Sequence, residues 1–593
     1  MANIGRRSVS AALVACSPPL ARIHERLFRA LSLEPPKGDE CGKPGGCDVR
    51  PSEYSSGVSG ALTQLQHPLG SVTAFGLDYF RGQWLSKLDD GKSSKLKEDA
   101  ALVRFAQAES ACMEVNKRSE RNWRDSPFAP EINLARKLAS KILGDFHWDD
   151  AARSFGWGPG ASVRLTRRKA DAVYKYCGTP QTTIGNAVLA NAAILHFPLW
   201  ASNLPDLPED EGVGKCHIVP GNRVVTVPKN YKTDRIIAIE PDMNTYVQQG
   251  IGKYIRRRLK LAGCDLQDQT RNQRMARIGS MSGSLATVDL SMASDTVSRG
   301  IVERIIRSDW LEALGQSRSP FGVLPSGEKI FYQKFSSMGN SYTFELETVI
   351  FYSLALACCL LKGEETSRVC VYGDDIVIPT GAVDRFFGLL AFAGFTPNES
   401  KSYWNGPFRE SCGKHYFAGH DVTPFYVKEV PKSLIDLFKL HNQVYRFEKR
   451  CGEWLGSERI DALRSFRAWL RSYAPAKWRR PTLLDGIGDG GFVGEFDEVL
   501  PNRCSRGWDG YWCQSMLSMP IPDESYDSSG ILVKAIALME RRRGEHALNF
   551  LTDSEDSVVF PIKGTRWRKA KVFIGQRLIG GQYTTSDKEE DHE

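Results

Sequence analysis

The chain has 593 residues, 41% of them hydrophobic, and its 78 Lys and Arg exceed its 70 Asp and Glu by a formal net charge of +8. That length allows a large core with more than one lobe, and the small charge excess indicates an acidic partner only where the cations are concentrated. The 14 Cys show no repeated C-x-x-C spacing, which argues against a disulfide framework or a structural zinc cluster and for reduced thiols.

The start of the chain predicts neither an export signal nor regular structure. Residues up to about 60 are rich in Gly, Pro and Ser and predict a loop-dominated segment. The apolar patch at 11–16 is too short for a signal sequence. The longest apolar run, Thr348 to Leu361, is also shorter than the roughly twenty residues that cross a bilayer, so it predicts a buried helix.

Three amphipathic segments predict helices in the first third of the chain. They begin at Ser94, run over 131–143, and run over 186–197 before Pro198. Between the second and third, the glycine-rich stretch 155–162 is followed by several cations. Flexible backbone with cations suits contact with a phosphate chain, and a solvated loop remains an equal alternative.

A basic strand is expected over Val225–Ile237, where apolar and polar residues alternate. It places Lys229, Lys232 and Arg235 three residues apart. These cations could converge on a polyphosphate whose charge must be neutralised as it departs. A solvated edge strand is the alternative.

An acid-terminated strand follows at Leu285–Leu290, an almost unbroken apolar run that contains Asp289. Such runs are typical of strands buried on both faces, and open sheets place their ligands at strand ends. A helix is expected to begin at Ser291 and to carry a second acid, Asp295, on its second turn.

The polar loop over 335–341 precedes the predicted buried helix. Gly339 allows the backbone to bend there, and Asn340 can both donate and accept hydrogen bonds.

The stretch Val369–Pro379 predicts a β-hairpin, because two runs rich in Val and Ile flank Gly373-Asp374-Asp375. Two adjacent carboxylates in a partly apolar setting raise each other's pKa unless a cation lies between them. The turn therefore indicates a divalent-metal site, with an ordinary solvated turn as the alternative. Beyond it, a helix is expected over 385–392, and Lys401 is a candidate proton donor.

Several strings in this order resemble the RNA-directed RNA polymerases, and specifically the replicase catalytic subunit of the single-stranded-RNA bacteriophages (leviviruses). The resemblance is firm from about 219 to 428 and rests on these strings: Thr226-Val227-Pro228-Lys229-Asn230, Ala286-Thr287-Val288-Asp289-Leu290-Ser291, Ser337-Met338-Gly339-Asn340 and Phe408-Arg409-Glu410-Ser411-Cys412-Gly413-Lys414-His415. It implies an α+β right-hand fold of fingers, palm and thumb, with an antiparallel palm sheet backed by helices. The implied regions are 1–220 for the N-terminal part and some of the fingers, 221–283 for a basic fingers segment, 284–430 for the palm, and 431–593 for the thumb and C-terminal part.

The resemblance also implies roles for individual residues. Asp289, Asp374 and Asp375 would hold two Mg²⁺ ions, and Lys401 would act as a general acid. Lys229, Lys232 and Arg235 would hold the nucleoside triphosphate. Asp295 and Asn340 would check for the 2′-hydroxyl, and Ser337 and Gly339 would shape the loop beside the template.

The implied activity is template-directed synthesis of RNA from ribonucleoside triphosphates on a viral single-stranded RNA, in the cytoplasm of an infected bacterium. Implied partners are the host elongation factors Tu and Ts and a small-subunit ribosomal protein, with no membrane. A reverse transcriptase, or a non-catalytic RNA-binding protein that retains the fold, remains the alternative.

Overall fold

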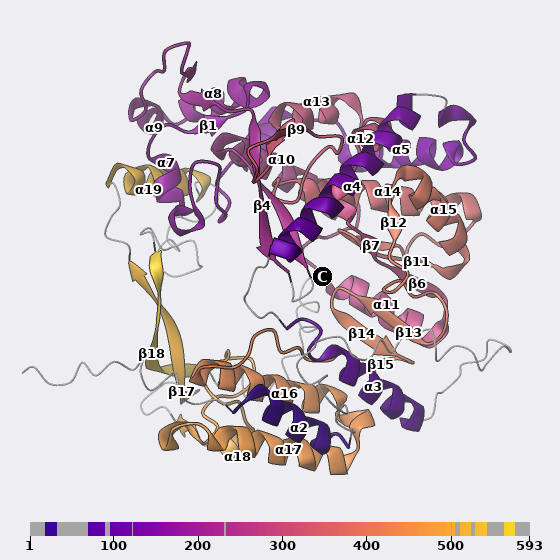
Figure 1. Ribbon diagram of the computed structural model, residues 1–593, viewed down its shortest axis with the longest axis vertical. Coiled ribbons are helices and arrows are strands. Elements are labelled where there is room, and N and C mark those ends of the chain that lie inside the picture. The colour runs from indigo at the N-terminus through magenta and orange to yellow at the C-terminus, as the bar shows by residue number, and fades with distance from the viewer. Residues whose placement is uncertain are drawn as a thin grey trace, which may run out of the picture.

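The structure is a computed structural model that describes residues 18–32, 69–88, 95–120, 123–229, 233–499, 501–503, 510–522, 528–542 and 562–575 (Figure 1). Lys232, one of the three predicted phosphate-binding cations, lies outside the described residues, as does most of the first 60 residues.

A small antiparallel sheet lies at the centre of the chain. Its strands are β10 (Cys370–Tyr372), β11 (Asp375–Pro379) and β6 (Leu285–Val288), in the order β10-β11-β6. The β10–β11 hairpin is the predicted one, and all four residues of β6 are buried, as expected for the acid-terminated strand. β-branched side chains suit this doubly covered position.

Helices cover both faces of this sheet. Alternate side chains, including those of Val288 and Ile376, enter the main core with α5 (Ala129–Leu143) and α14 (Thr343–Lys362). The intervening side chains, including that of Val377, pack against α11 (Thr270–Ser282). The expected α+β arrangement, an antiparallel sheet backed by helices, is confirmed.

The predicted buried helix is confirmed as α14. Among the described residues, it is the one helix long and apolar enough to cross a membrane, but 78% of its apolar window is buried inside the molecule. It is therefore the core helix against which the central sheet and α5 pack. The other expected helices correspond to α4 (Lys95–Glu120), α5, α8 (Ala187–Leu195) and α15 (Val383–Ala393).

The basic segment is not the single strand that its alternation predicted. It forms a hairpin of β4 (Gly221–Pro228) and β5 (Asp234–Ile239), so the chain reverses between Pro228 and Asp234. Proline has no N–H with which to continue a ladder, which explains why the first strand ends there. Of the two described cations, Lys229 consequently follows the end of β4, whereas Arg235 lies on β5.

The helix expected from Ser291 is also wrong. Leu290–Ser291 is the short strand β7, Met292 adopts a left-handed conformation with φ 54°, and Ala293–Asp295 is a single 3₁₀ turn. The α-helix begins later, as α12 (Arg299–Ile305), where the Ser298 side chain caps its N-terminus. Because β7 pairs with β12 (Thr396–Pro397), the chain is extended at Ser291 and the helix begins later in the sequence.

The two ends of the described chain share a second core. Helices α2 (Leu20–Ala30) and α3 (Leu69–Gln83) pack with α16 (Leu434–Leu455) and α17 (Ser457–Ser472) (Figure 1). Helix α2 lies within the segment that was expected to be loop-dominated, which is a correction. Its four buried side chains fall on one face, and the Gly- and Pro-rich composition around them masks that pattern.

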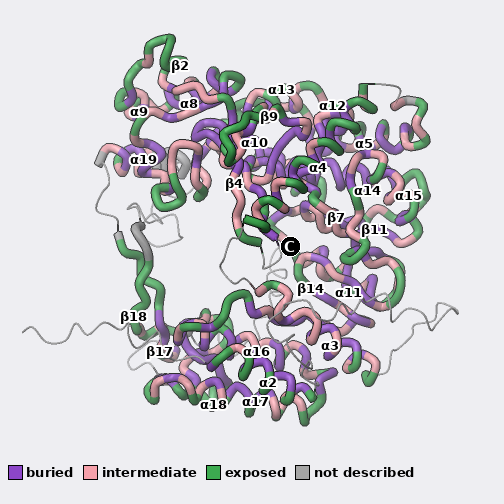
Figure 2. Tube along the Cα trace, in the orientation of Figure 1, coloured by how far each residue is buried: buried purple, intermediate pink, exposed green. Residues whose placement is uncertain are grey.

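A long two-stranded ribbon extends from this second core toward the opposite side of the molecule (Figure 1). Its strands are β17 (Gly510–Pro522) and β18 (Ile562–Gly575), and Figure 2 shows β18 largely exposed.

The remaining named elements are α6 (Trp148–Ala152), α7 (Ala172–Tyr176), β1 (Gln181–Thr182), α9 (Pro198–Ser202), β2 (Gly212–Val213), β3 (Cys216–Ile218), α10 (Asp242–Leu261), α13 (Ser308–Ser317), β8 (Phe321–Val323), β9 (Lys329–Phe331), β13 (Phe408–Ser411), β14 (Lys414–Phe417), β15 (His420–Asp421), α18 (Phe496–Val499), β16 (Asn502–Arg503) and α19 (Ser528–Arg542).

Candidate active site

Asp289 lies directly after β6 and is held by the segment that follows α15. The Asn398 side-chain amide donates to Asp289 Oδ2 at 2.8 Å, and the Asn398 backbone N–H donates to the Asp289 carbonyl at 2.8 Å. The Asp289 N–H donates to Ser402 Oγ at 3.1 Å. Lys401 Nζ lies 3.8 Å from Asp289 Oδ2, so the predicted proton donor is beside the predicted metal ligand.

The Gly373-Asp374-Asp375 turn packs against α14, which holds it in place. Gly373 has a positive φ of 61°, and a Cβ there would lie 2.3 Å from the Phe344 ring. The Gly373 N–H donates to Thr348 Oγ1 at 3.1 Å. A side chain at this position would be strained by the positive φ and would force the Phe344 ring to move, so glycine is favoured where the turn packs on the helix.

Asp375 is the first residue of β11 and is oriented by the turn between β13 and β14. Its Oδ1 accepts from the Cys412 N–H at 3.2 Å and from Ser411 Oγ at 3.4 Å. The register pairs Val288 with Ile376, so the next residues, Asp289 and Asp375, lie at the same end of neighbouring antiparallel strands.

Charge is costly in this group of aspartates. Burial raises the pKa of Asp289, with Asp374 adding to the increase while Lys401 and Asn398 oppose it. The pKa of Asp375 is raised to about 7, mainly by burial; the Cys412 hydrogen bond opposes this increase, and the charges of Asp374, Asp289 and Glu410 add to it. These carboxylates are therefore close enough to repel one another, and a cation would relieve both the burial cost and the repulsion.

The oxygen donors of these residues suit Mg²⁺, which typically binds one or two carboxylates together with substrate phosphates. Among the residues that the structure describes, no group of three or more His, Cys, Asp and Glu side chains is arranged so that it could hold a metal ion. The three aspartates are therefore candidate metal ligands because of their oxygen atoms and their negative charge. Their side chains are not arranged as a formed coordination shell.

Lys229 lies within electrostatic reach of these acids. Burial lowers its pKa, as do the neighbouring cations Arg235 and Lys401, whereas Asp289 and Asp374 raise it. Lys229 is therefore near enough to Asp289 and Asp374 for their charges to affect it, and its triphosphate-binding role stays a prediction. Arg235 is exposed on β5.

The 335–341 loop packs against β5. The Ala238 N–H donates to the Met338 carbonyl at 2.8 Å, and Gly339 has φ 118°. Ser337 is buried, and its carbonyl accepts from the Asn340 N–H at 3.0 Å. Asn340 Oδ1 accepts from the Tyr342 N–H, whereas its buried Nδ2 has no hydrogen-bond partner among the described residues. That amide is therefore available to donate to a ligand.

Asp295 has a partner that the sequence did not suggest. The Lys334 ammonium donates to its Oδ1 at 2.8 Å, and Lys334 is completely buried. No hydrogen bond joins the Asp295 and Asn340 side chains within the described part of the chain, so their predicted pairing stays a prediction.

Sequence reasoning also missed the residues that orient the acids. Asn398 and Ser402 hold Asp289, and the buried Glu347 accepts from Ser294 Oγ at 2.8 Å beside the Gly373 turn. Polar residues of this kind are common in loops, and no spacing rule identifies them. The position of Glu347 on the buried helix was the one available signal, because a buried acid requires a partner.

Comparisons with known proteins agree on one family. The family model described as "RNA replicase, beta-chain" matches residues 58–495. The RNA-directed RNA polymerase subunit beta of Escherichia virus Qbeta is 39% identical over 74% of this chain and 72% of its own length. The corresponding protein of Enterobacteria phage SP is 39% identical over 71% of this chain and 72% of its own length.

Among solved structures, the RNA-dependent RNA polymerase of BmCPV at its elongation state aligns over 58% of this chain and 33% of that chain, with a TM-score of 0.35 and 12% identity. That likeness is too weak to carry weight, whereas the matches in sequence extend over most of the chain. The chain therefore belongs to the RNA replicase beta-chain family, with the α+β fold and the RNA-directed RNA polymerase activity of that family.

Proposed function

We propose that this chain replicates and transcribes a viral single-stranded RNA genome by two-metal nucleotidyl transfer, with Asp289, Asp374 and Asp375 as the ligands of two Mg²⁺ ions. The observation that carries this proposal is the register of β6 and β11, which brings Asp289 and Asp375 to one end of the sheet beside the Asp374 turn. When bound, the ions would lower the pKa of the 3′-hydroxyl and neutralise the departing pyrophosphate.

The cations and the loop supply the remaining functions. Lys229, Lys232 and Arg235 hold the triphosphate as its charge redistributes, and Lys401 gives a proton to the leaving group. Ser337 and Gly339 shape the loop beside the template.

Sugar recognition is proposed for Asp295 and Asn340. The 2′-hydroxyl can donate and accept, so a carboxylate oxygen and an amide N–H would recognise it together. The free, buried Nδ2 of Asn340 supports this assignment, because a buried donor without a partner is costly unless a ligand satisfies it.

The first test removes one proposed ligand charge with little change of shape. Asp374→Asn is expected to abolish nucleotide incorporation, because an amide is a poor Mg²⁺ ligand, while RNA binding stays largely intact. Incorporation on a primed RNA and binding of the same RNA would be measured side by side, with Asp384→Asn, at an exposed position on α15, as a matched control. Retained polymerisation by Asp374→Asn would remove the metal assignment.

The second test separates the proposal from its alternatives. A reverse transcriptase would prefer deoxyribonucleotides, and a non-catalytic RNA-binding protein would extend neither substrate. We expect ribonucleotides to be preferred on a primed RNA template, because a site built to hydrogen-bond a hydroxyl rejects an analogue that lacks it. Clear preference for deoxyribonucleotides would contradict the proposal.

The regional roles are also proposed. Residues 284–430 form the palm, 1–220 and 221–283 contribute the N-terminal region and fingers, and 431–593 form the thumb and C-terminal region, with α2 and α3 packed on the last of these. We infer that the chain acts in the cytoplasm of the infected bacterium with elongation factors Tu and Ts and a small-subunit ribosomal protein. Identification of the proteins that co-purify with the chain tests this.

A further inference from the structure

We propose that Lys334 and Glu109 are positioning residues for sugar selection, because they hold Asp295 in the orientation that meets the 2′-hydroxyl. This inference rests on the role proposed above for Asp295. It adds two residues that lie outside the aspartate group and come from different parts of the chain.

The first observation is the complete burial of Lys334. Its side chain has no exposure to solvent, and its ammonium lies 2.8 Å from Asp295 Oδ1 and 3.6 Å from Glu109 Oε1. The same nitrogen lies 3.9 Å from the centre of the Phe105 ring. A buried amino group needs such partners, so this lysine is paired and fixed in position.

The second observation concerns the two oxygens of Asp295. Oδ1 receives the Lys334 hydrogen bond, whereas no described residue donates to Oδ2. The Asp295 side chain retains 11% of its exposure. Lys334 therefore fixes one oxygen and leaves the other available to a substrate hydroxyl.

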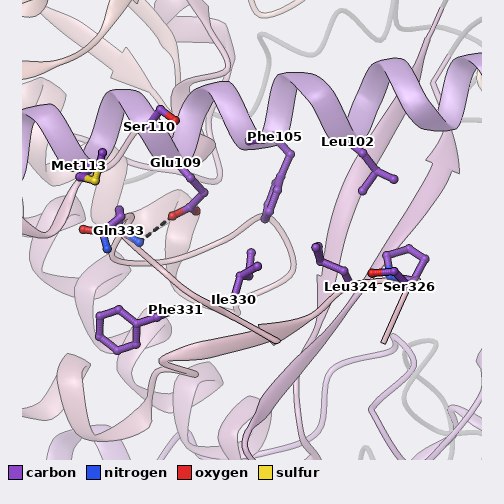
Figure 3. Close-up of a pocket in the computed structure, with 12 residues that line it drawn as sticks. Leu102, Phe105, Glu109, Ser110, Met113, Leu324, Ser326, Ile330, Phe331 and Gln333 are labelled. Carbon is purple, nitrogen blue, oxygen red and sulfur yellow. Dashed lines mark hydrogen bonds between the residues drawn. The ribbon is translucent and has the colours of Figure 1, made fainter. Parts of the chain in front are cut away.

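Glu109 anchors the lysine from the opposite side. It belongs to α4, and its Oε2 accepts from the Gln333 N–H at 2.6 Å, while its buried Oε1 has no hydrogen-bond donor. Figure 3 shows Glu109 and Phe105 directed from α4 toward the segment around β9, beside a cavity of about 330 Å³. Glu109 thus ties the lysine, and through it Asp295, to the long helix.

Stability alone is a weak explanation for this arrangement. Burying charges is expensive, and replacement of a buried ion pair by apolar residues is often neutral or stabilising. A network that fixes one oxygen of the Asp295 carboxylate has a different benefit. Discrimination between ribonucleotides and deoxyribonucleotides depends on the group that binds the 2′-hydroxyl being held in place.

The experiment compares four variants in single-nucleotide incorporation on a primed RNA. Lys334→Met removes the ammonium, Glu109→Gln weakens its anchor with little change of shape, and Asp295→Asn tests the sugar-reading role itself. Lys329→Met is the matched control, because Lys329 is exposed on neighbouring β9. For each, kcat/KM is measured for a ribonucleotide and for its deoxyribonucleotide, and folding is checked by thermal unfolding.

Lys334→Met is expected to lower the ratio of ribonucleotide to deoxyribonucleotide kcat/KM about tenfold or more, mainly through the ribonucleotide. Glu109→Gln should lower it about two- to threefold, because Asp295 keeps its direct partner, and Lys329→Met should not change it. If Lys334→Met does not fold, the Glu109→Gln ratio decides the matter. Equal losses for both nucleotides, or an unchanged ratio in Glu109→Gln, would show a merely structural role and overturn the inference. An unchanged ratio in Asp295→Asn would instead overturn the proposed role of Asp295.

Discussion

Gly339 shows how strongly a single residue constrains the candidate site. Its φ of 118° is unfavourable for any residue with a side chain, and a Cβ there would lie 2.1 Å from the Ala238 carbonyl oxygen. The obstacle is backbone in a paired strand, which cannot rotate away as a side chain would. The loop that presents Ser337 and Asn340 therefore depends on glycine at this position.

We expect Gly339→Ala to lower the free energy of unfolding by at least about 2 kcal/mol and to reduce incorporation, because both strain and a backbone clash are introduced. Denaturant unfolding with a parallel incorporation assay measures both effects. Gly315→Ala is the matched control, since Gly315 lies in α13 with open space around it. That control should be neutral or up to about 1 kcal/mol more stable. Equal stability of the two variants would contradict the argument.

Glu347 gives a prediction about pH. The pKa of this carboxyl is raised to about 8, mainly by burial; the Ser294 hydrogen bond opposes this increase, and the charges of Asp374, Glu345 and Asp295 contribute to it. The folded chain therefore keeps a proton on Glu347 that the unfolded chain loses near its ordinary pKa of about 4.3. Because the folded state binds more protons between these values, this group makes stability fall as the pH rises from about 4 to 8.

Glu347→Gln removes this dependence and can still accept the Ser294 hydrogen bond. The stability of the variant relative to the parent chain should therefore increase by about 1.4 kcal/mol per pH unit at most within that window. Denaturant unfolding at pH 5, 6.5 and 8 measures the difference, with Glu312→Gln on α13 as the control for an exposed helical acid. Parallel curves for the parent chain and Glu347→Gln would contradict the shift.

At the scale of elements, the apolar pattern predicted the secondary structure where burial of that pattern determines the conformation. The helices α4 and α5 follow from apolar spacing, and α14 follows from its long apolar run. Glycine follows α5, α14 and α15 and lies in the turn of the β10–β11 hairpin. Prediction failed where a tertiary contact decides the conformation. The pairing of β7 with β12 prevents a helix from starting at Ser291, and the reversal at Pro228 divides an alternating segment into two strands.

The candidate site was likewise predicted only in part. The candidate acids could be proposed from the sequence because metal chemistry limits the residue types that can serve as ligands, and the structure places Asp289, Asp375 and Lys401 at one end of the sheet. Their metal-binding role stays a prediction. The orienting residues could not be identified. Asn398 donates a hydrogen bond to Asp289, and Lys334 donates one to Asp295. Because each donor comes from a separate segment of the chain, no local sequence pattern indicates these contacts.

At the scale of the whole molecule, the second core joins residues from the two ends of the described chain. Phe80 on α3 is fully buried, with its ring 5.0 Å from that of Phe425 and 4.9 Å from that of Phe447 on α16. The Thr73 hydroxyl also donates to the Trp454 carbonyl. The C-terminal helices therefore depend on a segment more than 300 residues earlier in the chain, while α14 has its own core.

This separation predicts a local effect of a core substitution. Phe80→Ala leaves a cavity beside Phe425 and Phe447, between α3 and α16, and should cost about 3–5 kcal/mol in that core. Hydrogen exchange should accelerate in peptides from α16 well before those from α14, because the two helices belong to different cores. Leu96→Ala is the control, since Leu96 is 82% exposed and its truncation should change stability by no more than about 0.5 kcal/mol. Equal acceleration in α14 and α16 would mean that the two cores open as one cooperative unit, and any loss of polymerase activity in Phe80→Ala would then come from global unfolding.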